Sequence, residues 1–302
     1  MHRKKDPKRN PLLPIIIYRK EAAMLGTLYL CATPIGNLED ITFRVLRTLQ
    51  EVDLIAAEDT RNTIKLLNHF EIKTPLTSYH EYNKYDKAAA LTQKLLNGTN
   101  IALVTDAGTP GISDPGEEIV KQAYAANIPV TSLPGACACI TALTLSGLST
   151  RRFAFEAFLP SDKKERQRIL TSLQTETRTV ILYESPHHLK NTLSLLYDFL
   201  GNRSITLCRE LTKIHETIQP TTLVDAISYY QEHDPRGEYV LVLAGRNPAE
   251  LEAEKKSSWK SISIEEHMDR YLSQGLSRKD AMKQVASDRG VSKREIYQSL
   301  LP

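Results

Sequence analysis

Acidic and basic side chains gather directly after three stretches that the sequence predicts to be strands, and these clusters are the first candidates for chemistry. They are Glu58–Arg61 (EDTR), Tyr183–Ser185 (YES) and Arg209–Lys213 (RELTK). Neighbouring carboxylates and cations are the groups that transfer protons and stabilise developing charge in active sites. Because each cluster follows a strand, the three can meet at one sheet edge. A structural network of ion pairs explains the same spacing equally well.

Three turn segments rich in Gly, Pro and small residues also follow predicted strands. They span 32–38 (ATPIGNL), 105–116 (TDAGTPGISDPG) and 133–136 (LPGA). Open α/β sheets bind ligands in the loops at the carboxyl ends of their strands, and small residues there let a ligand approach the backbone. Asp106 or Asp114 can accept a hydrogen bond from a ribose hydroxyl or an ammonium group. Turn chemistry explains any one segment alone, but three together favour a binding crevice.

Several common site motifs are absent. The chain has no G-x-x-x-x-G-K-[ST], G-x-G-x-x-G, H-E-x-x-H or G-x-S-x-G pattern. Cys137 and Cys139 lie in an apolar run without a second Cys or His pair nearby, which favours buried thiols over a metal site. His187 and His188 are adjacent, so on a helix they face different directions, and we interpret them as helix-start residues near a site.

Strand-like and helix-like stretches alternate from Thr27 to Leu145. The predicted strands are 27–32, 54–57, 101–105 and 129–133, and the predicted helices are 41–52, 63–70, 88–96, 117–126 and 136–145. Apolar strands separated by helices are typical of a mainly parallel sheet covered on both faces. A second α/β unit begins near Arg151. Its predicted strands are 153–158, 179–183, 204–208 and 239–244, and its predicted helices are 164–173 and 189–200.

The last forty residues read as helices with explicit start signals. Ser263 and Ser292 begin capping boxes with Glu three residues later, and Ser277 begins a weaker one with Asp280. The pattern fits a helix-turn-helix and a small helical cap equally well. Basic residues in this part favour a nucleic-acid contact; they are Arg278, Lys279, Lys283, Lys293 and Arg294.

Composition and charge set the wider limits. The 302 residues contain 41% hydrophobic and 25% charged residues and four cysteines, which predicts a globular cytoplasmic protein without a disulfide scaffold. No apolar run approaches the ~18 residues needed to cross a bilayer. Residues 1–24 carry seven Lys or Arg against two Asp or Glu, and residues 255–302 carry ten against six, so the body between them is acidic. Any polyanion should therefore bind the basic ends and local patches.

The predicted domain organisation has five parts. They are a basic, disordered extension (1–24), a first α/β domain (25–148), a second α/β domain (149–246), a polar linker (247–260) and a helical domain (261–302). Translation starting at Met24 is an alternative explanation of the extension.

Eight motifs carry a resemblance to a known family. In order, they are TPIGNLEDIT (33–42), DLIAAEDTR (53–61), ALVTDAGTPGISDPG (102–116), LPGACACITAL (133–143), FEAFLP (155–160), YESPHHL (183–189), RELTKIHET (209–217) and GEYVLVLAG (237–245). Together they resemble the bacterial small-subunit ribosomal RNA cytidine 2′-O-methyltransferases of the tetrapyrrole methylase superfamily, over roughly residues 25–300. Two positions depart from the close family pattern: Ala136 stands where proline is usual, and His188 where arginine is usual.

The resemblance implies a homodimer, each chain having two α/β domains with S-adenosylmethionine in the cleft between them and a C-terminal helical part. It implies methyl transfer to the ribose 2′-oxygen of a cytidine in the decoding region of 16S rRNA, presented as RNA or as the small ribosomal subunit. Matching the superfamily's cofactor loops to this chain gives Pro34, Ile35, Asp106, Ala107, Gly108, Ile112, Cys137, Ala138, Glu184 and Leu211.

A ribose hydroxyl is a weak acid and needs a base as it attacks a sulfonium methyl group. The candidate bases are Glu58, Asp59 and Glu210, while Arg61 and Lys213 can orient a phosphate or stabilise the oxyanion. RNA contacts are expected from the helical tail and from a second basic set: Arg151, Arg152, Lys163, Lys164, Arg166 and Arg168. Two alternatives remain: a methylase of a porphyrin precursor, and a nucleic-acid-binding regulator without catalysis.

Overall fold

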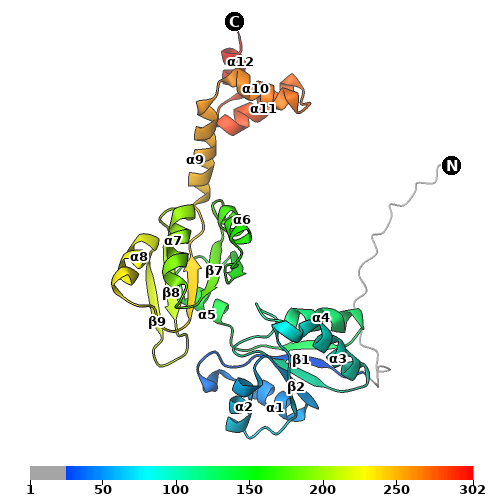
Figure 1. Cartoon of the computed structure of the whole chain (residues 1–302). Helices are drawn as coiled ribbons and strands as arrows, with labels where there is room; N and C mark the ends of the chain where they lie inside the picture. Colours follow the sequence, from blue (N-terminus) through cyan, green and yellow to red (C-terminus); the bar gives the residue numbers. More distant parts are fainter. Residues whose placement is uncertain (1–24, 302) are drawn as a thin grey trace, which may run out of the picture. The chain divides into compact units, whose positions relative to one another are not determined.

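The computed structural model describes residues 25–301, so the predicted extension at 1–24 lies outside the described residues. The chain divides into two compact units between Cys137 and Ala138 (Figure 1). Among the described residues, no helix combines the length and the apolar character that a membrane span requires. The five-part organisation stays a prediction.

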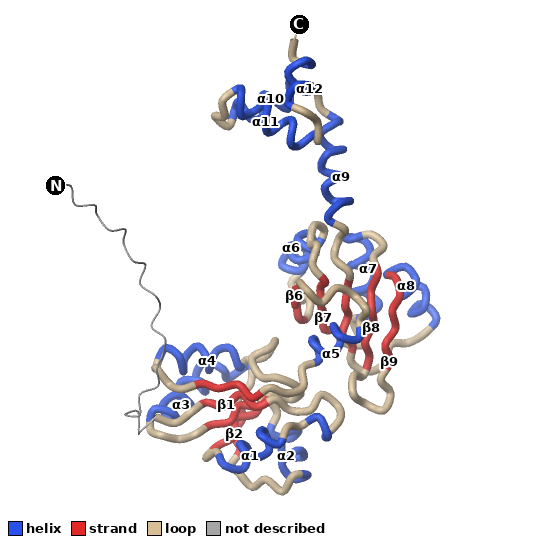
Figure 2. The backbone as a smooth tube through the Cα atoms, turned by 180° about the vertical axis from the view of Figure 1, so that it is seen from behind, coloured by secondary structure: helices blue, strands red, loops and turns tan. Residues whose placement is uncertain are grey.

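The first unit is built on a five-stranded parallel sheet in the order β3-β2-β4-β1-β5. The parallel arrangement is as the sequence predicts. Its strands are β1 (Leu28–Cys31), β2 (Leu54–Ala57), β3 (Leu76–Ser78), β4 (Ile101–Val104) and β5 (Val130–Leu133). Figure 2 shows α1 (Phe43–Glu51) and α2 (Thr60–His69) on one face, and α3 (Lys84–Leu96) and α4 (Gly116–Ala125) on the other. Ile55 packs into the core on the α1 and α2 face, and its neighbour Ala56 packs into the core on the opposite face. Burial on both faces is why these strands read as continuous apolar runs.

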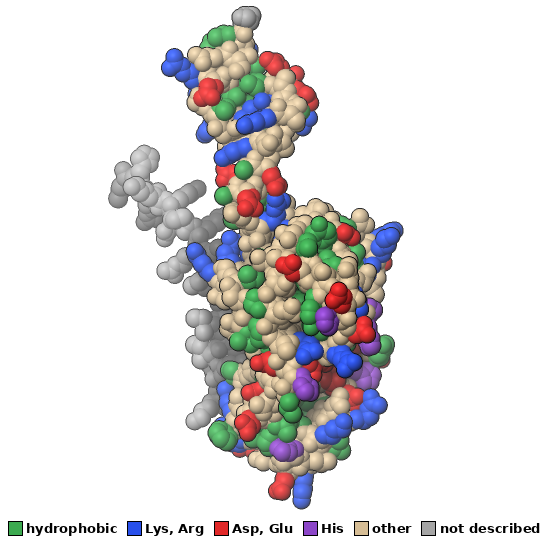
Figure 3. Space-filling view, turned by 90° about the vertical axis from the view of Figure 1, so that its left-hand side faces the viewer, with side chains coloured by type: hydrophobic (Ala, Val, Ile, Leu, Met, Phe, Trp, Pro, Cys, Tyr) green, Lys and Arg blue, Asp and Glu red, His purple; other side chains and the backbone are tan. Residues whose placement is uncertain are grey.

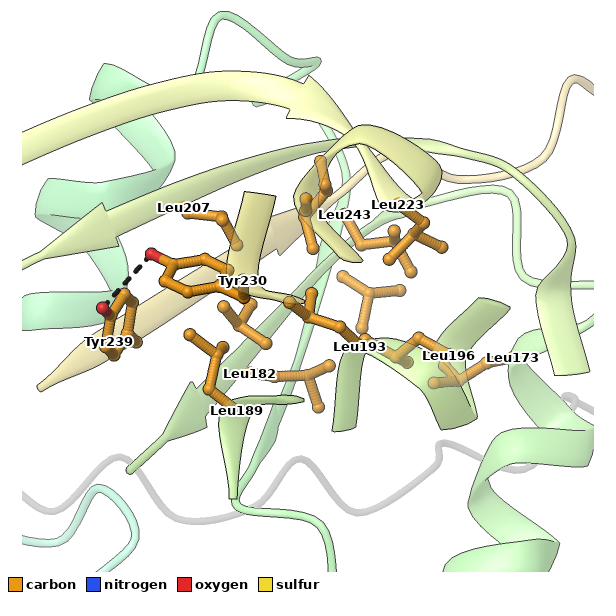
Figure 4. Close-up of a cluster of buried hydrophobic side chains, with 14 of the residues drawn as sticks. Leu173, Leu182, Leu189, Leu193, Leu196, Leu207, Leu223, Tyr230, Tyr239 and Leu243 are labelled. Atoms are coloured by element: carbon orange, nitrogen blue, oxygen red, sulfur yellow. Dashed lines mark hydrogen bonds between the residues drawn. The ribbon is translucent and has the colours of Figure 1, made fainter. Parts of the chain in front are cut away.

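The second unit contains a mixed five-stranded sheet in the order β6-β7-β10-β8-β9. Its strands are β6 (Phe153–Ala157), β7 (Thr179–Glu184), β8 (Ser204–Arg209), β9 (Thr217–Thr222) and β10 (Tyr239–Leu243). Only β6 and β7 pair in parallel, while β7–β10, β10–β8 and β8–β9 are antiparallel. The helices α6 (Lys163–Leu173), α7 (Leu189–Leu200) and α8 (Leu223–Glu232) supply the apolar side chains that cover one face (Figure 4).

The helix α5 (Ala138–Leu145), which the sequence assigns to the first domain, packs on the opposite face of this second sheet. Thr206 on β8 anchors that contact, because its hydroxyl donates to the Ser146 carbonyl at 2.8 Å. In the core on the other face, the Tyr230 hydroxyl donates a hydrogen bond of 3.2 Å to the Tyr239 hydroxyl (Figure 4). The buried Tyr230 hydroxyl therefore has an acceptor, and the Tyr239 hydroxyl also accepts the Arg236 N–H at 3.3 Å.

The sequence prediction misses β3, β9 and α8. Strand β9 (TIQPTT) carries Pro220, which argues against a central strand, yet an edge strand tolerates a missing N–H. The segment predicted as a linker contains the helix α9 (Pro248–Ser258) and the short turn η3 (Trp259–Ser261). Asn247 caps α9 and Pro248 occupies its first turn. The polar segment therefore contains a helix-start signal of its own.

Three helices, α10 (Ile264–Ser273), α11 (Arg278–Arg289) and α12 (Lys293–Ser299), confirm the helical prediction for the last forty residues. Ser263, Ser277 and Ser292 each accept the predicted backbone hydrogen bond at a helix start. Met268 and four side chains from α11 and α12 form their small core. Beside that core, the buried His267 ring stacks on Trp259 with centroids 3.9 Å apart.

Candidate active site

The three glycine-containing turns of the first unit are tied to one another at the carboxyl end of the sheet. Thr33 and Gly108 exchange two backbone hydrogen bonds of 2.9 and 3.0 Å, which join the turn after β1 to the turn after β4. The Thr109 hydroxyl donates to the Ala136 carbonyl at 3.0 Å, which joins the second turn to the third. The predicted convergence of these turns is therefore present within one unit.

Two glycines permit this close approach. Gly108 has a φ of +85°, and a Cβ atom there would lie 3.3 Å from Ile35 Cγ2 and 3.5 Å from the Ala136 carbonyl oxygen. A Cβ atom on Gly135 would lie 2.6 Å from the Ala32 Cβ atom. Side chains at these positions would push the turns apart, so the turns can lie in contact because the residues are small.

The Glu58–Arg61 cluster joins the same edge through the end of β4. The Asp59 N–H donates to Asp106 Oδ1 at 3.1 Å, and the Thr105 hydroxyl donates to Glu58 Oε2 at 2.7 Å. Two candidate bases, Glu58 and Asp59, thus lie beside a predicted cofactor residue, Asp106.

Asp59 and Arg61 form a bidentate pair. Arg61 Nη2 lies 2.6 Å from Asp59 Oδ2, and Nε lies 3.0 Å from Oδ1. Hydrogen bonds from the Arg61 side chain and backbone lower the pKa of Asp59 to about 2. A carboxylate that releases its proton so readily is a weak base. The Arg61 side chain is 87% exposed, so its guanidinium remains open to a second anion.

A cavity of about 350 Å³ opens between α2 and the turn after β1. Its lining includes Pro34 and Asp106, which the sequence predicts as cofactor residues, but not Ile35, Ala107 or Ile112. The other lining residues are Thr33, Gly36, Leu38, Asn62, Thr63, Lys65, Leu66, His69 and Thr105. The sequence prediction misses the α2 contribution, although Lys65 and His69 have the four-residue spacing that puts two side chains on one helix face.

Asp114, the second acid of the long turn, is committed to the backbone. Its carboxylate accepts the N–H groups of Gly111, Ile112 and Gly116 at distances between 2.7 and 3.1 Å. These bonds shape the turn before α4 and leave Asp106 as the better acceptor for a ligand.

In the second unit, the YES and RELTK clusters flank the start of β10. Tyr239 is paired with Glu184 on one side and with Arg209 on the other, so both clusters lie at one edge of that sheet. Glu184 is buried; its oxygens accept the Ser185 N–H at 2.7 Å and the Thr192 hydroxyl at 2.5 Å. The Oε2 contact thus ties this predicted cofactor residue to the first turn of α7, and the Oε1 contact ties it to the backbone of the next residue.

Glu210 and Lys213 form a three-member ionic cluster with Glu238. Lys213 Nζ lies 2.9 Å from Glu210 Oε1 and 2.8 Å from Glu238 Oε2. Partial burial raises the pKa of Glu210, but the Glu238 N–H and the Lys213 ammonium outweigh it, so the pKa ends below its ordinary value. The rival explanation, a structural ion-pair network, therefore has support at this cluster.

The same strand ends leave buried polar atoms without partners. Ser185 Oγ, Arg209 Nε and Thr212 Oγ1 are buried and make no hydrogen bond within residues 25–301. Leu211 is buried between Glu210 and Thr212, whose φ values are +52° and +66°. Orphaned polar atoms and positive φ angles in non-glycine residues are typical of binding sites.

Comparison with known proteins assigns the chain to a family. Residues 27–227 match the profile of the Tetrapyrrole (Corrin/Porphyrin) Methylases. The chain belongs to this family. Among solved structures, this methylase resembles uroporphyrin-III-C-methyltransferase from Thermus thermophilus, with a TM-score of 0.52 and 20% identity over 72% of this chain and 94% of the other. It also resembles diphthine synthase, with a TM-score of 0.57 and 14% identity over 72% and 90%. At these identities the likeness shows the fold alone, and it confirms the predicted fold.

Sequence relatives of this methylase are much more similar. It is 51% identical to ribosomal RNA small subunit methyltransferase I of Halalkalibacterium halodurans, over 90% of this chain and 93% of the relative. The protein with the same name in a Synechocystis strain is 50% identical, over 91% and 97%. That in Bacillus subtilis is 48% identical, over 90% and 93%. The family predicted from the eight motifs is confirmed.

Membership of this methylase family makes S-adenosylmethionine the methyl donor, as the sequence predicts. The residues of the first unit fit such a ligand. Asp106 is exposed and can accept a hydrogen bond from a ribose hydroxyl or an ammonium group. The buried Thr33–Gly108 bridge fixes the backbone next to it.

Proposed function

We propose that this chain methylates the ribose 2′-oxygen of a cytidine in the decoding region of small-subunit ribosomal RNA. The observation that carries the proposal is 48–51% identity, across nine-tenths of the chain, with ribosomal RNA small subunit methyltransferases. Such a function operates in the cytoplasm, where ribosomes assemble. A homodimer is part of the same proposal.

We assign the cofactor to the tied turns of the first unit. Pro34, Ile35, Asp106, Ala107 and Gly108 are the residues there that we propose hold it. When bound, S-adenosylmethionine supplies a sulfonium methyl group. Ile112, Cys137, Ala138, Glu184 and Leu211 remain predicted cofactor residues from the resemblance. A structural role is an alternative to cofactor binding for Glu184, because both of its carboxylate oxygens already accept hydrogen bonds from the protein.

Among the three candidate bases, Glu58 is our choice. General-base catalysis is most efficient when the pKa of the base lies near the operating pH, and cations and backbone N–H groups lower the pKa values of Asp59 and Glu210. Glu58 accepts its hydrogen bond from the neutral Thr105 hydroxyl and lies beside Asp106 at the end of β4. The exposed Arg61 guanidinium would orient the RNA by binding a phosphate, and Lys213 remains a candidate for a similar contact.

The basic C-terminal helices supply part of the RNA contact in this proposal. Arg278, Lys279 and Lys283 on α11 and Lys293 and Arg294 on α12 are all exposed. On the face drawn in Figure 3, Lys and Arg side chains lie among Asp and Glu on these helices. Phosphate contacts of this kind weaken steeply as the salt concentration rises.

A methyl-transfer assay tests the function. Purified protein, labelled S-adenosylmethionine and small ribosomal subunits from cells lacking this gene should give label in the RNA, at a cytidine that resists alkaline cleavage on its 3′ side. Uroporphyrinogen serves as the competing substrate. Label in the porphyrin alone, or no label in the presence of bound cofactor, contradicts the proposal.

A further inference from the structure

Three aromatic side chains form a cluster in the second unit, at the end of β6. The Phe155 and Tyr183 ring centroids lie 4.9 Å apart, and the Phe158 and Tyr183 centroids lie 5.7 Å apart, both in edge-to-face geometry. Edge-to-face contacts of this kind stabilise aromatic pairs beyond simple burial. Tyr183 thus contacts both phenylalanine rings.

The backbone around Phe158 is held firmly. Ala157, the residue before it, has a φ of +54°, and the pairing of β6 with β7 shifts register between Phe155 and Ala157. Arg166 Nη1 donates to the carbonyls of Pro160 and Ser161 at 2.9 and 3.1 Å, which fixes the turn that follows. The register shift leaves Glu156 out of the pairing just before Ala157 and Phe158, and bulges of this kind bend a strand at a defined position.

Phe158 nevertheless remains 54% exposed. A single exposed apolar side chain is common on protein surfaces. This ring, however, packs edge-to-face on Tyr183 and follows a residue with a positive φ, so it does not lie on a loose loop. Exposed lysines, Lys163 and Lys164, follow within six residues at the start of α6. A fixed aromatic face beside cations is the combination that binds single-stranded nucleic acid, through base stacking and phosphate contacts.

We propose that Phe158 is a stacking surface for one unpaired base of the RNA substrate, and that Lys163 and Lys164 contact the phosphates beside that base. The proposal rests on the proposed function, because it names the part of the site that takes the RNA strand. A ribose buried in a helix cannot reach a catalytic site, so a nucleotide must leave its stack, and an aromatic ring replaces part of the stacking lost. Arg166, expected from the sequence to contact RNA, also donates to the turn that follows the ring.

Binding of a short single-stranded oligoribonucleotide with one 2-aminopurine tests the role of the ring directly. Phe158→Ala should weaken binding about tenfold, which corresponds to about 1.4 kcal/mol and lies within the range measured for base–aromatic stacking. Phe158→Leu should weaken it nearly as much because an apolar side chain without a π face cannot stack. Phe158→Tyr should bind within twofold of the wild type. Annealing the probe into a duplex should abolish the difference between variants.

Phe43→Ala is the matched control, since Phe43 is 93% exposed at the start of α1 in the other unit. It should leave probe binding unchanged. For methylation of small subunits, Phe158→Ala should raise KM with a smaller effect on kcat, while cofactor affinity and thermal unfolding of Phe158→Leu stay near wild type. Equal binding by wild type and Phe158→Leu overturns the stacking role even if the wild type methylates RNA. If the wild type does not methylate RNA but probe binding still depends on Phe158, the proposed function is contradicted and the stacking role is not.

Discussion

Gly108→Ala perturbs the turn after β4 at the point where it contacts the turn after β1. Gly111→Ala, in the same turn, is its matched control. Both glycines have a φ of +85°, but a Cβ atom on Gly111 meets nothing within 4 Å, whereas one on Gly108 meets Ile35 Cγ2 at 3.3 Å. An L-residue in this region of φ costs about 1–2 kcal/mol, so Gly111→Ala should lower the free energy of unfolding by that amount. Gly108→Ala should lower it by roughly 1 kcal/mol more, because Ile35 must move to admit the methyl group.

The cofactor separates the two variants further. The Thr33–Gly108 bridge fixes the backbone beside Asp106, so a shift there displaces a predicted cofactor contact. We expect Gly108→Ala to weaken S-adenosylmethionine binding roughly 2- to 13-fold, the equivalent of one hydrogen bond of about 0.5–1.5 kcal/mol. Gly111→Ala should bind it normally. Urea unfolding and isothermal titration calorimetry measure both quantities. Equal destabilisation by the two variants, or unchanged cofactor affinity in Gly108→Ala, would refute the reasoning.

Three further predictions follow from single contacts. Glu58→Gln should lower kcat by about 10²- to 10⁴-fold with cofactor affinity preserved, the usual loss on removing a general base; near-normal turnover in a single-turnover assay would exclude that role. Hydrogen bonds from Arg178 lower the pKa of Glu176 from 4.5 to about 2, so its stabilising contribution is complete above pH 4.5 and disappears as the pH falls toward 2. Glu176→Gln should therefore be less stable than wild type in urea at pH 6, with a gap that narrows at pH 3; a constant gap contradicts the linkage. Ser292→Ala removes the capping box of α12 and should destabilise the C-terminal helices by about 1 kcal/mol, measured by hydrogen exchange, whereas Ser299→Ala should not.

The elements that the sequence predicts well are those whose signals are local. Buried parallel strands appear as apolar runs, and the serines before α10, α11 and α12 mark helix starts because a cap acts within three residues. Strand β9 was missed because its pairing with β8 is its defining feature, and Pro220 obscures the alternation. The antiparallel pairing of β10 is likewise a tertiary outcome that no local pattern specifies.

The sequence predicts where the candidate site lies in the fold, but it does not predict the role of each residue in it. The rule that ligands bind at the carboxyl ends of strands locates the three turns, which the Thr33–Gly108 bridge and the Thr109–Ala136 hydrogen bond tie together. The same rule does not distinguish Asp106 from Asp114 as the ligand acceptor. Only the hydrogen bonds in the structure show that Asp114 shapes its turn while Asp106 is open to a ligand. The sequence around Lys65 shows only helical spacing and does not indicate a cavity. The residues that line the cavity opposite α2 are distant from Lys65 in the sequence.

Backbone strain separates the site from the rest of the described chain. Positive φ angles in non-glycine residues occur at Glu71, Ser113, Asn127, Ala157, Glu210 and Thr212. Glu71 and Asn127 follow the ends of α2 and α4, where a left-handed residue is an ordinary helix terminus. No helix end explains the others: Ser113 lies in the turn after β4, Ala157 ends β6, and Glu210 and Thr212 follow β8. Such conformations persist only where surrounding contacts enforce them. These φ angles therefore occur at strand ends where we propose that cofactor or RNA binds, and they lie next to Leu211 and Phe158 in the sequence.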